Sequence, residues 1–208
     1  MHNIIYFHKK FAKPTSMKLT YKISAFAFIS AMLFNSCSSN DETKTFLATT
    51  DTSTLKTFKD VTFSLDQSEG YDAGLFFSTE LGKSFKKGQI DATVTPKIDV
   101  AFYSAGSSLN YFLSPSDPDH GIKNGTLSFF INVPKELLTI EQFNKIEKGS
   151  EFDALKIDGD DGESFPDDKT PNIVLFKNVA GKKGAIYIKS VHRVGFDPRI
   201  VVDIKIQK

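Results

Sequence analysis

Apolar and polar residues alternate along four stretches of this chain, at residues 61–65, 98–103, 127–133 and 200–206. Successive side chains of a β-strand point to opposite faces of its sheet, so each stretch predicts a strand with one buried and one wetter face. One-faced strands favour antiparallel sheets. In 127–133 the more apolar row is Leu127, Phe129, Ile131 and Val133, and it alternates with Ser128, Phe130 and Asn132.

The last third of the chain predicts a three-stranded meander. Residues 172–179 and 185–194 flank the segment 180–184, whose two glycines suit a hairpin loop with positive φ angles. A turn at residues 195–198 then leads into the last strand. These three strands are therefore expected to pair with one another in chain order.

One short helix is predicted over residues 140–148. Thr139 and Gln142 stand three residues apart, as in a capping box, and Gly149 is a natural residue just beyond a helix end. Phe143 and Ile146 lie on one face of this helix, so they could pack on a sheet.

These patterns predict an all-β, mainly antiparallel fold, either a β-sandwich or an open barrel, with one short α-helix near 140–148. The strands are predicted to form a single β-rich domain over residues 58–208. The segment 37–57 is rich in threonine and serine and is predicted to be a flexible tether.

Ahead of the tether, residues 17–36 have the pattern of a secretory signal peptide. Lys18 and Lys22 precede an apolar run, residues 23–34, which has the length of a signal core. A membrane-spanning helix needs about 20 apolar residues, so this run is too short to span stably. Residues 1–16 add a basic, aromatic stretch before a complete signal. They indicate a start codon placed too early, with a long n-region as the alternative.

Charge and cysteine content exclude several classes of function. Residues 1–36 hold five of the 26 basic residues and none of the 25 acidic ones, which leaves the remainder with a formal charge of −4. A net negative domain argues against a nucleic-acid partner. Cys37 is the only cysteine, so a disulfide within the chain is excluded. If Cys37 carries lipid, no thiol remains for catalysis or metal binding.

The densest chemical feature is an acidic segment, residues 158–168. Calcium takes six to eight oxygen ligands, and an acidic loop with glycines can supply them. The spacing departs from the EF-hand pattern, because its third ligand position falls on Gly162. The segment predicts either a weak calcium site or a solvated acidic loop. The candidate ligands are Asp158, Asp160, Asp161, Glu163, Asp167 and Asp168.

Three tyrosines, Tyr71, Tyr103 and Tyr111, are candidates for stacking on a sugar ring, with partly buried sheet aromatics as the alternative. A second polar loop, residues 113–121, contains Asp117, Asp119 and His120. Carboxylates and a histidine on one loop are compatible with a small hydrolase. Consecutive proline and aspartate are equally typical of turns, so no catalytic residue is assigned.

Three segments resemble the small lipoproteins of Bacteroidota. They are LFNSCSSNDE at 33–42, GLFFSTELGKSF with KIDVAFYS at 74–85 and 97–104, and a closing part, VLFKNVAGKKGAIYIKSV and IVVDIKIQK, at 174–191 and 200–208. In the first segment, Leu33-Phe34-Asn35-Ser36-Cys37 resembles a loose lipobox with its leucine one place early. The group has no activity that can be carried over to a residue.

The resemblance implies that Cys37 is linked to diacylglycerol, becomes the first residue and is N-acylated. More than one acyl chain gives stable anchoring. Residues 38–42 resemble the surface-export signal of these lipoproteins, which places the protein on the outer membrane, exposed at the cell surface, with the periplasmic face as the alternative.

The sequence therefore predicts a lipid-anchored envelope or surface protein with a non-catalytic domain that binds a glycan or an envelope protein. The alternatives are a calcium-stabilised adhesive module and a small carboxylate-dependent hydrolase. No other cofactor is predicted.

Overall fold

The computed structural model describes residues 54–66, 73–105, 108–134, 138–169, 172–194 and 197–208. All of them fall within one compact unit, residues 49–208. The predicted signal peptide, Cys37 and Tyr71 lie outside the described residues. Among the residues described, no helix has the length and apolar character needed to cross a membrane.

The larger of two antiparallel sheets has five strands. In pairing order these are β1 (Leu55–Ser64), β9 (Asp197–Gln207), β8 (Lys183–Val194), β7 (Asn172–Lys177) and β6 (Phe129–Ile131). The predicted meander of the last three strands is confirmed, because β8 pairs with both β7 and β9. β1 begins at Leu55 and pairs with β9 from its first residue, so the predicted tether end at residue 57 is wrong by three residues.

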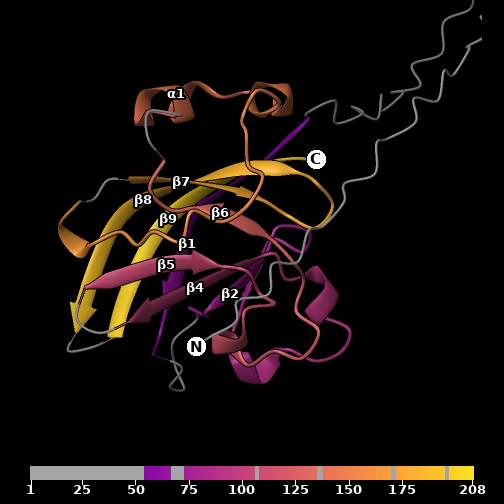
Figure 1. Cartoon of the computed structure of the whole chain (residues 1–208), viewed down its shortest axis with the longest axis vertical. Coiled ribbons are helices and arrows are strands. Elements are labelled where there is room, and N and C mark those ends of the chain that lie inside the picture. The colour runs from indigo at the N-terminus through magenta and orange to yellow at the C-terminus, as the bar shows by residue number, and fades with distance from the viewer. Residues whose placement is uncertain (1–53, 67–72, 106–107, 135–137, 170–171, 195–196) are drawn as a thin grey trace, which may run out of the picture. The chain divides into compact units, whose positions relative to one another are not determined.

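The smaller sheet has four short strands in the pairing order β3 (Lys83–Phe85), β2 (Phe76–Ser78), β4 (Val100–Ala105) and β5 (Leu109–Leu113). The two sheets lie in separate layers, with α1 (Ile140–Lys145) beyond the larger sheet (Figure 1). Single turns of 3-10 helix connect the strands: η1 (Lys87–Gln89), η2 (Thr95–Lys97), η3 (Pro118–His120), η4 (Gly149–Phe152) and η5 (Asp167–Lys169).

The core between the sheets is built around Phe112 of β5. Its ring centroid lies 5.5 to 6.1 Å from those of four other buried rings, Phe63, Phe102, Phe130 and Phe165. Isoleucines and valines of β8 and β9 complete this cluster from the larger sheet. The predicted all-β, mainly antiparallel class is confirmed as a two-sheet sandwich, and the described strands close no barrel.

Side chains and single bridges connect the sheets where their strands do not pair. The Asn132 amide accepts from the Phe112 N–H at 2.7 Å and donates to the Phe112 C=O at 3.0 Å, as a neighbouring strand would. Gly74 forms a parallel bridge to Phe63, and a Cβ at this glycine would lie 2.0 Å from the Phe85 oxygen. Unpaired strand edges expose backbone N–H and C=O groups. These contacts supply hydrogen-bond partners for such groups where the two sheets meet.

The inward face of β6 is opposite to the one that its more apolar row suggests. Ser128, Phe130 and Asn132 are buried, whereas Leu127 and Val133 are 51% and 38% exposed. On the inward face Asn132 pairs with β5 and the Ser128 N–H donates to Ser114 Oγ at 3.1 Å, while Phe129 and Ile131 of the other row pack against the cluster that contains Phe143.

The predicted helix begins as expected and ends early. Thr139 and Gln142 form the capping box, with bonds of 2.7 and 3.1 Å. The helix stops at Lys145, because Ile146 is extended and Lys205 of β9 donates 2.8 Å bonds to the carbonyls of Phe143 and Ile146. Phe143 and Ile146 are buried against the larger sheet, as predicted.

Candidate functional site

The acidic segment, residues 158–168, runs along the edge of β6 and is bonded to it. Asp160 Oδ1 accepts from the Phe130 N–H at 2.7 Å, and Asp161 Oδ2 accepts from the Val133 N–H at 2.9 Å. The Asp161 N–H donates in turn to the Phe130 carbonyl at 3.2 Å. β6 is the last strand of its sheet, so these two carboxylates supply the acceptors that a further strand would provide.

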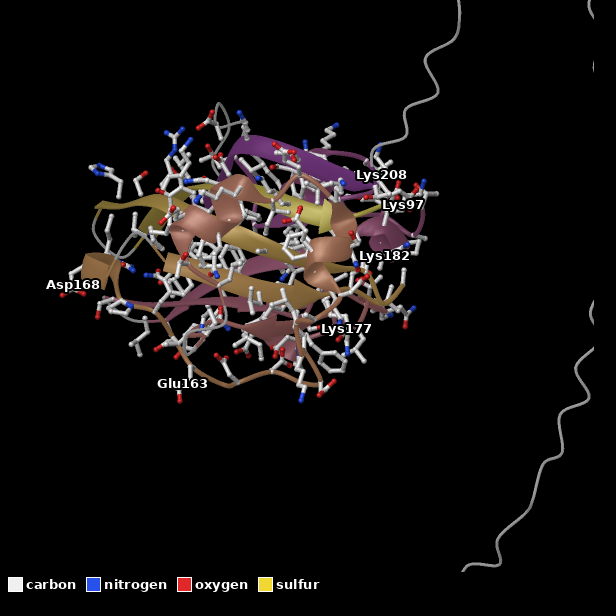
Figure 2. All side chains as sticks on the ribbon, turned by 90° about the horizontal axis from the view of Figure 1, so that it is seen from above. Lys97, Glu163, Asp168, Lys177, Lys182 and Lys208 are labelled. Atoms are coloured by element: carbon white, nitrogen blue, oxygen red, sulfur yellow. The ribbon has the colours of Figure 1, made fainter. Side chains whose placement is uncertain are left out.

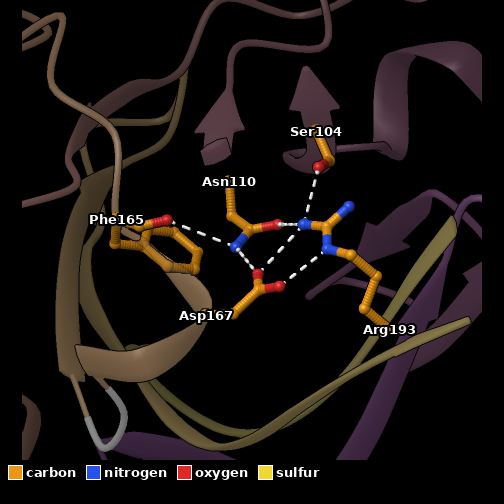
Figure 3. A network of polar contacts seen from close by, with 5 residues as sticks. All are labelled: Ser104, Asn110, Phe165, Asp167 and Arg193. Atoms are coloured by element: carbon orange, nitrogen blue, oxygen red, sulfur yellow. Dashed lines mark hydrogen bonds and ion pairs between the residues drawn. The ribbon is translucent and has the colours of Figure 1, made fainter. Parts of the chain in front are cut away.

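Asp167, at the other end of the acidic segment, forms an ion pair with Arg193 of β8 (Figure 3). Arg193 Nε donates to Asp167 Oδ2 at 2.7 Å, and Arg193 Nη2 donates to Asp167 Oδ1 at 3.0 Å. The same Nη2 reaches Asn110 Oδ1 at 3.1 Å and Ser104 Oγ at 3.3 Å. The network therefore joins β8 of the larger sheet to β4 and β5 of the smaller one.

The electrostatics of this network are those of a structural contact. The hydrogen bond from Arg193 lowers the pKa of Asp167, and a bond from Asn110 Nδ2 at 2.7 Å adds to the effect, while burial opposes it. The Arg193 side chain is only 11% exposed. The network thus fixes the end of the acidic segment between the sheets.

The structure does not bring the six predicted calcium ligands together. Asp160, Asp161 and Asp167 are bonded to the protein, and Figure 2 shows Glu163 and Asp168 at separate places on the surface. Asp158 is exposed. Within the described ranges, no three Asp, Glu, His or Cys side chains form a group able to hold a metal ion. Edge capping explains Asp160 and Asp161, and the ion pair with Arg193 explains Asp167, so the segment is not a purely solvated loop.

We expect millimolar calcium or a chelator to leave the melting temperature unchanged. A site of the weak extracellular kind has a Kd of about 10⁻⁴ to 10⁻³ M, so ~10 mM calcium would add roughly 1.4 to 2.7 kcal/mol. That would raise the melting temperature by about 3–10 °C for a domain of this size. Thermal unfolding with calcium, with magnesium and with chelator measures it, and a rise specific to calcium would restore the calcium hypothesis.

Two of the three predicted tyrosines form a pair on the outer face of the smaller sheet. Tyr103 of β4 and Tyr111 of β5 are cross-strand partners, with ring centroids 6.3 Å apart and planes inclined by 47°. Phe102 and Phe112, one position along each strand, point into the core, so the two tyrosines point outward. Both are partly exposed, and we call them the tyrosine pair.

The same face carries a pocket of about 590 Å³, here called the loop pocket. Its walls are the segments 87–96 and 121–124, with Ile90 and Ile122 packed on the apolar cluster over β2 and β4. Asp91 Oδ1 accepts from the backbone N–H groups of Thr93 and Val94 at 2.8 and 2.9 Å, which holds one wall. The volume of the loop pocket lies within the ~300–1,000 Å³ range of ligand sites.

His120 connects the tyrosine pair to the loop pocket. Its ring packs edge-on against Phe76 at 5.4 Å and Tyr103 at 6.1 Å, and the next residue, Gly121, lines the pocket. Burial lowers the pKa of His120 to about 4, although Asp117 and Asp119 oppose this. His120 Nε2 is buried and has no hydrogen-bond partner among the residues described. The histidine is therefore neutral at pH 7 and closed off from solvent.

The predicted hydrolytic carboxylates lie beside this region without lining it. Asp117 caps η3 by accepting from the Asp119 N–H at 2.9 Å. This is the role in a turn that the sequence offered as the alternative to a hydrolase. Neither Asp117 nor Asp119 contributes to the wall of the loop pocket. The geometry provides no carboxylate pair directed into this pocket.

Sequence reasoning missed Arg193, the loop pocket and a buried carboxylate, Asp99. Asp99 accepts from the Thr79 N–H at 2.9 Å and from Asn178 Nδ2 at 3.2 Å, and burial raises its pKa. One signal was available for Arg193. Only two arginines, Arg193 and Arg199, occur among the 26 basic residues, and arginine is preferred for bidentate carboxylate contacts.

We compared the chain with protein-family models, with curated proteins and with solved structures, and no match was found. The predicted resemblance to Bacteroidota lipoproteins therefore stays a prediction, and function must be argued from the geometry of the site.

Proposed function

We propose that this protein is a non-catalytic binding protein, held on the outer membrane by acylated Cys37, whose β domain binds a glycan on the outer face of the smaller sheet. The observation that carries the proposal is the partly exposed tyrosine pair on the same face as the loop pocket. An envelope protein is the alternative partner on this face. Exposure at the cell surface, with the periplasmic face as the alternative, is part of the proposal.

The tyrosine pair has the properties of a sugar-binding platform. Each ring offers an apolar face and a polar hydroxyl, which suits a sugar ring that has both kinds of surface. The inclined rings stand on neighbouring strands, and strand pairing keeps their spacing constant. Few rotatable bonds are ordered when such rigid side chains bind, so little entropy is lost.

The loop pocket adds depth beside this platform. Its walls combine apolar side chains, such as Ile90, Ile122 and Pro96, with Lys87 and Lys123. An apolar concavity with few polar groups is typical of ligand sites. A chain-like ligand could place one unit in the pocket and the next on the tyrosine pair.

Two observations support binding without catalysis. Asp99 and Asp167 are both engaged in hydrogen-bond networks between elements of the fold, and neither lines the loop pocket. The nearest histidine, His120, is buried and neutral at pH 7. A hydrolase would need an acid and a base directed at a bound substrate.

Replacing both tyrosines, Tyr103→Ala with Tyr111→Ala, is expected to weaken glycan binding at least tenfold, since aromatic contacts are worth about 1 kcal/mol or more each. Glycans that bind the parent protein are first identified by screening a panel, and titration calorimetry with these glycans then measures the change in affinity. Tyr187→Ala is the matched control, because Tyr187 is also partly buried but packs on Phe143 outside the larger sheet. Melting curves establish that each variant is folded.

Equal affinity of the double variant and the parent protein would remove the tyrosine pair from the site. Binding by envelope proteins alone would replace the glycan with the alternative partner. Release of shortened glycan products by the purified protein would overturn the non-catalytic assignment and favour the hydrolase.

A further inference from the structure

A second pocket, of about 460 Å³, lies at the end of the larger sheet where β1 begins and β9 ends. We call it the lysine pocket. Its polar lining consists mainly of three lysines and two hydroxyl groups, together with one carboxylate: Lys148, Lys182, Lys208, Thr54, Ser150 and Asp153.

Backbone and side-chain hydrogen bonds hold the walls of the lysine pocket in place. The Gly149 N–H donates to Thr54 Oγ1 at 3.0 Å, and the Lys208 N–H donates to the Thr54 carbonyl at 2.9 Å. Gln207 Nε2 donates to the Gly149 carbonyl at 3.0 Å and to Asp153 Oδ1 at 2.7 Å. Three separate segments are thus fixed around one concavity, so a ligand finds the pocket already formed.

Three of the residues that line the lysine pocket are lysines. Lys148, Lys182 and Lys208 are all exposed. Figure 2 shows Lys97, Lys177, Lys182 and Lys208 on one side of the view, while Glu163 and Asp168 lie away from them. Asp153 is the single carboxylate side chain in the pocket wall, and Lys182 also donates to the Lys208 carbonyl.

The lysine pocket also lies where the chain enters the domain. Thr54, in its wall, precedes the first residue of β1. Cys37 is 17 residues earlier along the chain, and a chain of that length reaches at most about 60 Å. If Cys37 carries acyl chains, this end of the domain is the part connected most directly to the membrane.

We infer that the lysine pocket binds the phosphate groups of anionic lipid headgroups in the membrane that carries the anchor. This rests on the proposed function, because it takes the acylated Cys37 as the reason for proximity. Ammonium groups and hydroxyls are the donors that phosphate oxygens accept from. Lysines act on a charged membrane only within about one Debye length, ~8–10 Å, and the tyrosine pair lies on the smaller sheet, whereas the lysine pocket lies at the end of the larger sheet.

Vesicle binding by the full chain carrying Cys37→Ser tests this inference without acyl chains. Co-sedimentation compares vesicles of phosphatidylcholine with vesicles that also contain phosphatidylglycerol. The lysine-pocket variant is Lys148→Gln with Lys182→Gln and Lys208→Gln. We expect it to bind the anionic vesicles at least tenfold more weakly, since each lysine near an anionic surface contributes roughly a fivefold factor.

The matched control is Lys59→Gln with Lys145→Gln and Lys189→Gln, which removes the same charge from exposed lysines that line neither pocket. It is expected to bind within about twofold of the parent, because charge outside a Debye length is screened. Equal losses in both triple variants would mean that only net charge matters and would overturn the inference. So would tight binding of inorganic phosphate in the lysine pocket without vesicles, which would indicate a soluble ligand.

Failure of this inference differs from failure of the proposed function. Palmitate labelling of the parent protein reports the anchor, and glycan titration of the tyrosine variants reports the binding face. Neither readout depends on Lys148, Lys182 or Lys208.

Discussion

Replacing Cys37 with serine is expected to abolish palmitate labelling and to move the protein from the membrane fraction to the soluble fraction. Serine lacks the thiol that forms the thioether to diacylglycerol in the lipoproteins which the segment 33–42 resembles. Each buried CH₂ of an acyl chain contributes about 0.8 kcal/mol to membrane binding. Loss of two or three chains therefore removes nearly all of the affinity.

Metabolic labelling with palmitate, followed by fractionation and a salt wash, measures this result. Ser38→Ala is the matched control, since it changes the neighbouring residue and keeps the thiol. A Cys37→Ser protein that stays in the washed membranes and keeps its label would disprove the lipoprotein hypothesis. Mass spectrometry of the parent protein locates its first residue, and the hypothesis requires this to be acylated Cys37.

Arg193→Met is expected to lower the free energy of unfolding by about 2–3 kcal/mol at pH 7. Breaking a buried ion pair costs roughly 3–5 kcal/mol, and the 29% exposure of the Asp167 side chain reduces this figure. Methionine keeps most of the apolar stem and removes the donors to Asp167, Asn110 and Ser104. Urea titration of the parent and the variant gives the difference.

The effect of Arg193→Met should depend on pH in one direction. The pKa of Asp167 is lower in the folded protein than its ordinary value, first because of the hydrogen bond from Arg193. Such a carboxyl stabilises the fold at pH values above its unfolded pKa of about 3.9, and this stability is lost as the pH falls through the folded pKa. The difference in the free energy of unfolding between parent and variant should therefore be largest at pH 7 and become smaller in acid.

An exposed ion pair supplies the control for Arg193. Lys97 Nζ lies 3.0 Å from Glu80 Oε1, and the two side chains are 40% and 62% exposed. Lys97→Met should cost less than about 1 kcal/mol, because solvent screens such pairs. If Arg193→Met costs no more than Lys97→Met, or if its cost is unchanged at low pH, the Arg193 network does not hold the sheets together.

The fold class could be predicted because strands with one buried face leave a period of two in the sequence. The meander of β7, β8 and β9 was accessible for the same reason, since its connections are short and local. Of the two loop glycines that were expected at positive φ, Gly181 has a φ of +75°, whereas Gly184 lies within β8 and is not at positive φ. The capping box of α1 was also local, whereas the end of α1 was decided by Lys205, 60 residues beyond Lys145.

The face of β6 could not be predicted from hydrophobicity. Phe130 is the one large apolar residue of its row, yet that row faces the core. In that row Asn132 bonds to Phe112 of β5, 20 residues away along the chain, while part of the other row packs on a second apolar cluster. A polar residue that completes a sheet edge looks, in sequence, the same as one that faces water.

The residues of the candidate site were also predictable only in part. Tyr103 and Tyr111 were selected from the sequence, and the structure makes them neighbours because β4 and β5 pair in register. Lysines lining the two pockets were not selected, because both walls are built from loops that give no periodic signal.

By itself the sequence determined the antiparallel β class, the meander of the last three strands and the start of the helix, because each depends on residues close together in the chain; the signal that ends at Cys37 stays a prediction. Only the tertiary structure decided that Asp160 and Asp161 cap a strand edge, that Asp167 pairs with Arg193, and that lysines gather where β1 begins. The physical reason is that a charge acts on whatever lies within a few ångströms of it, and that neighbour is set by folding.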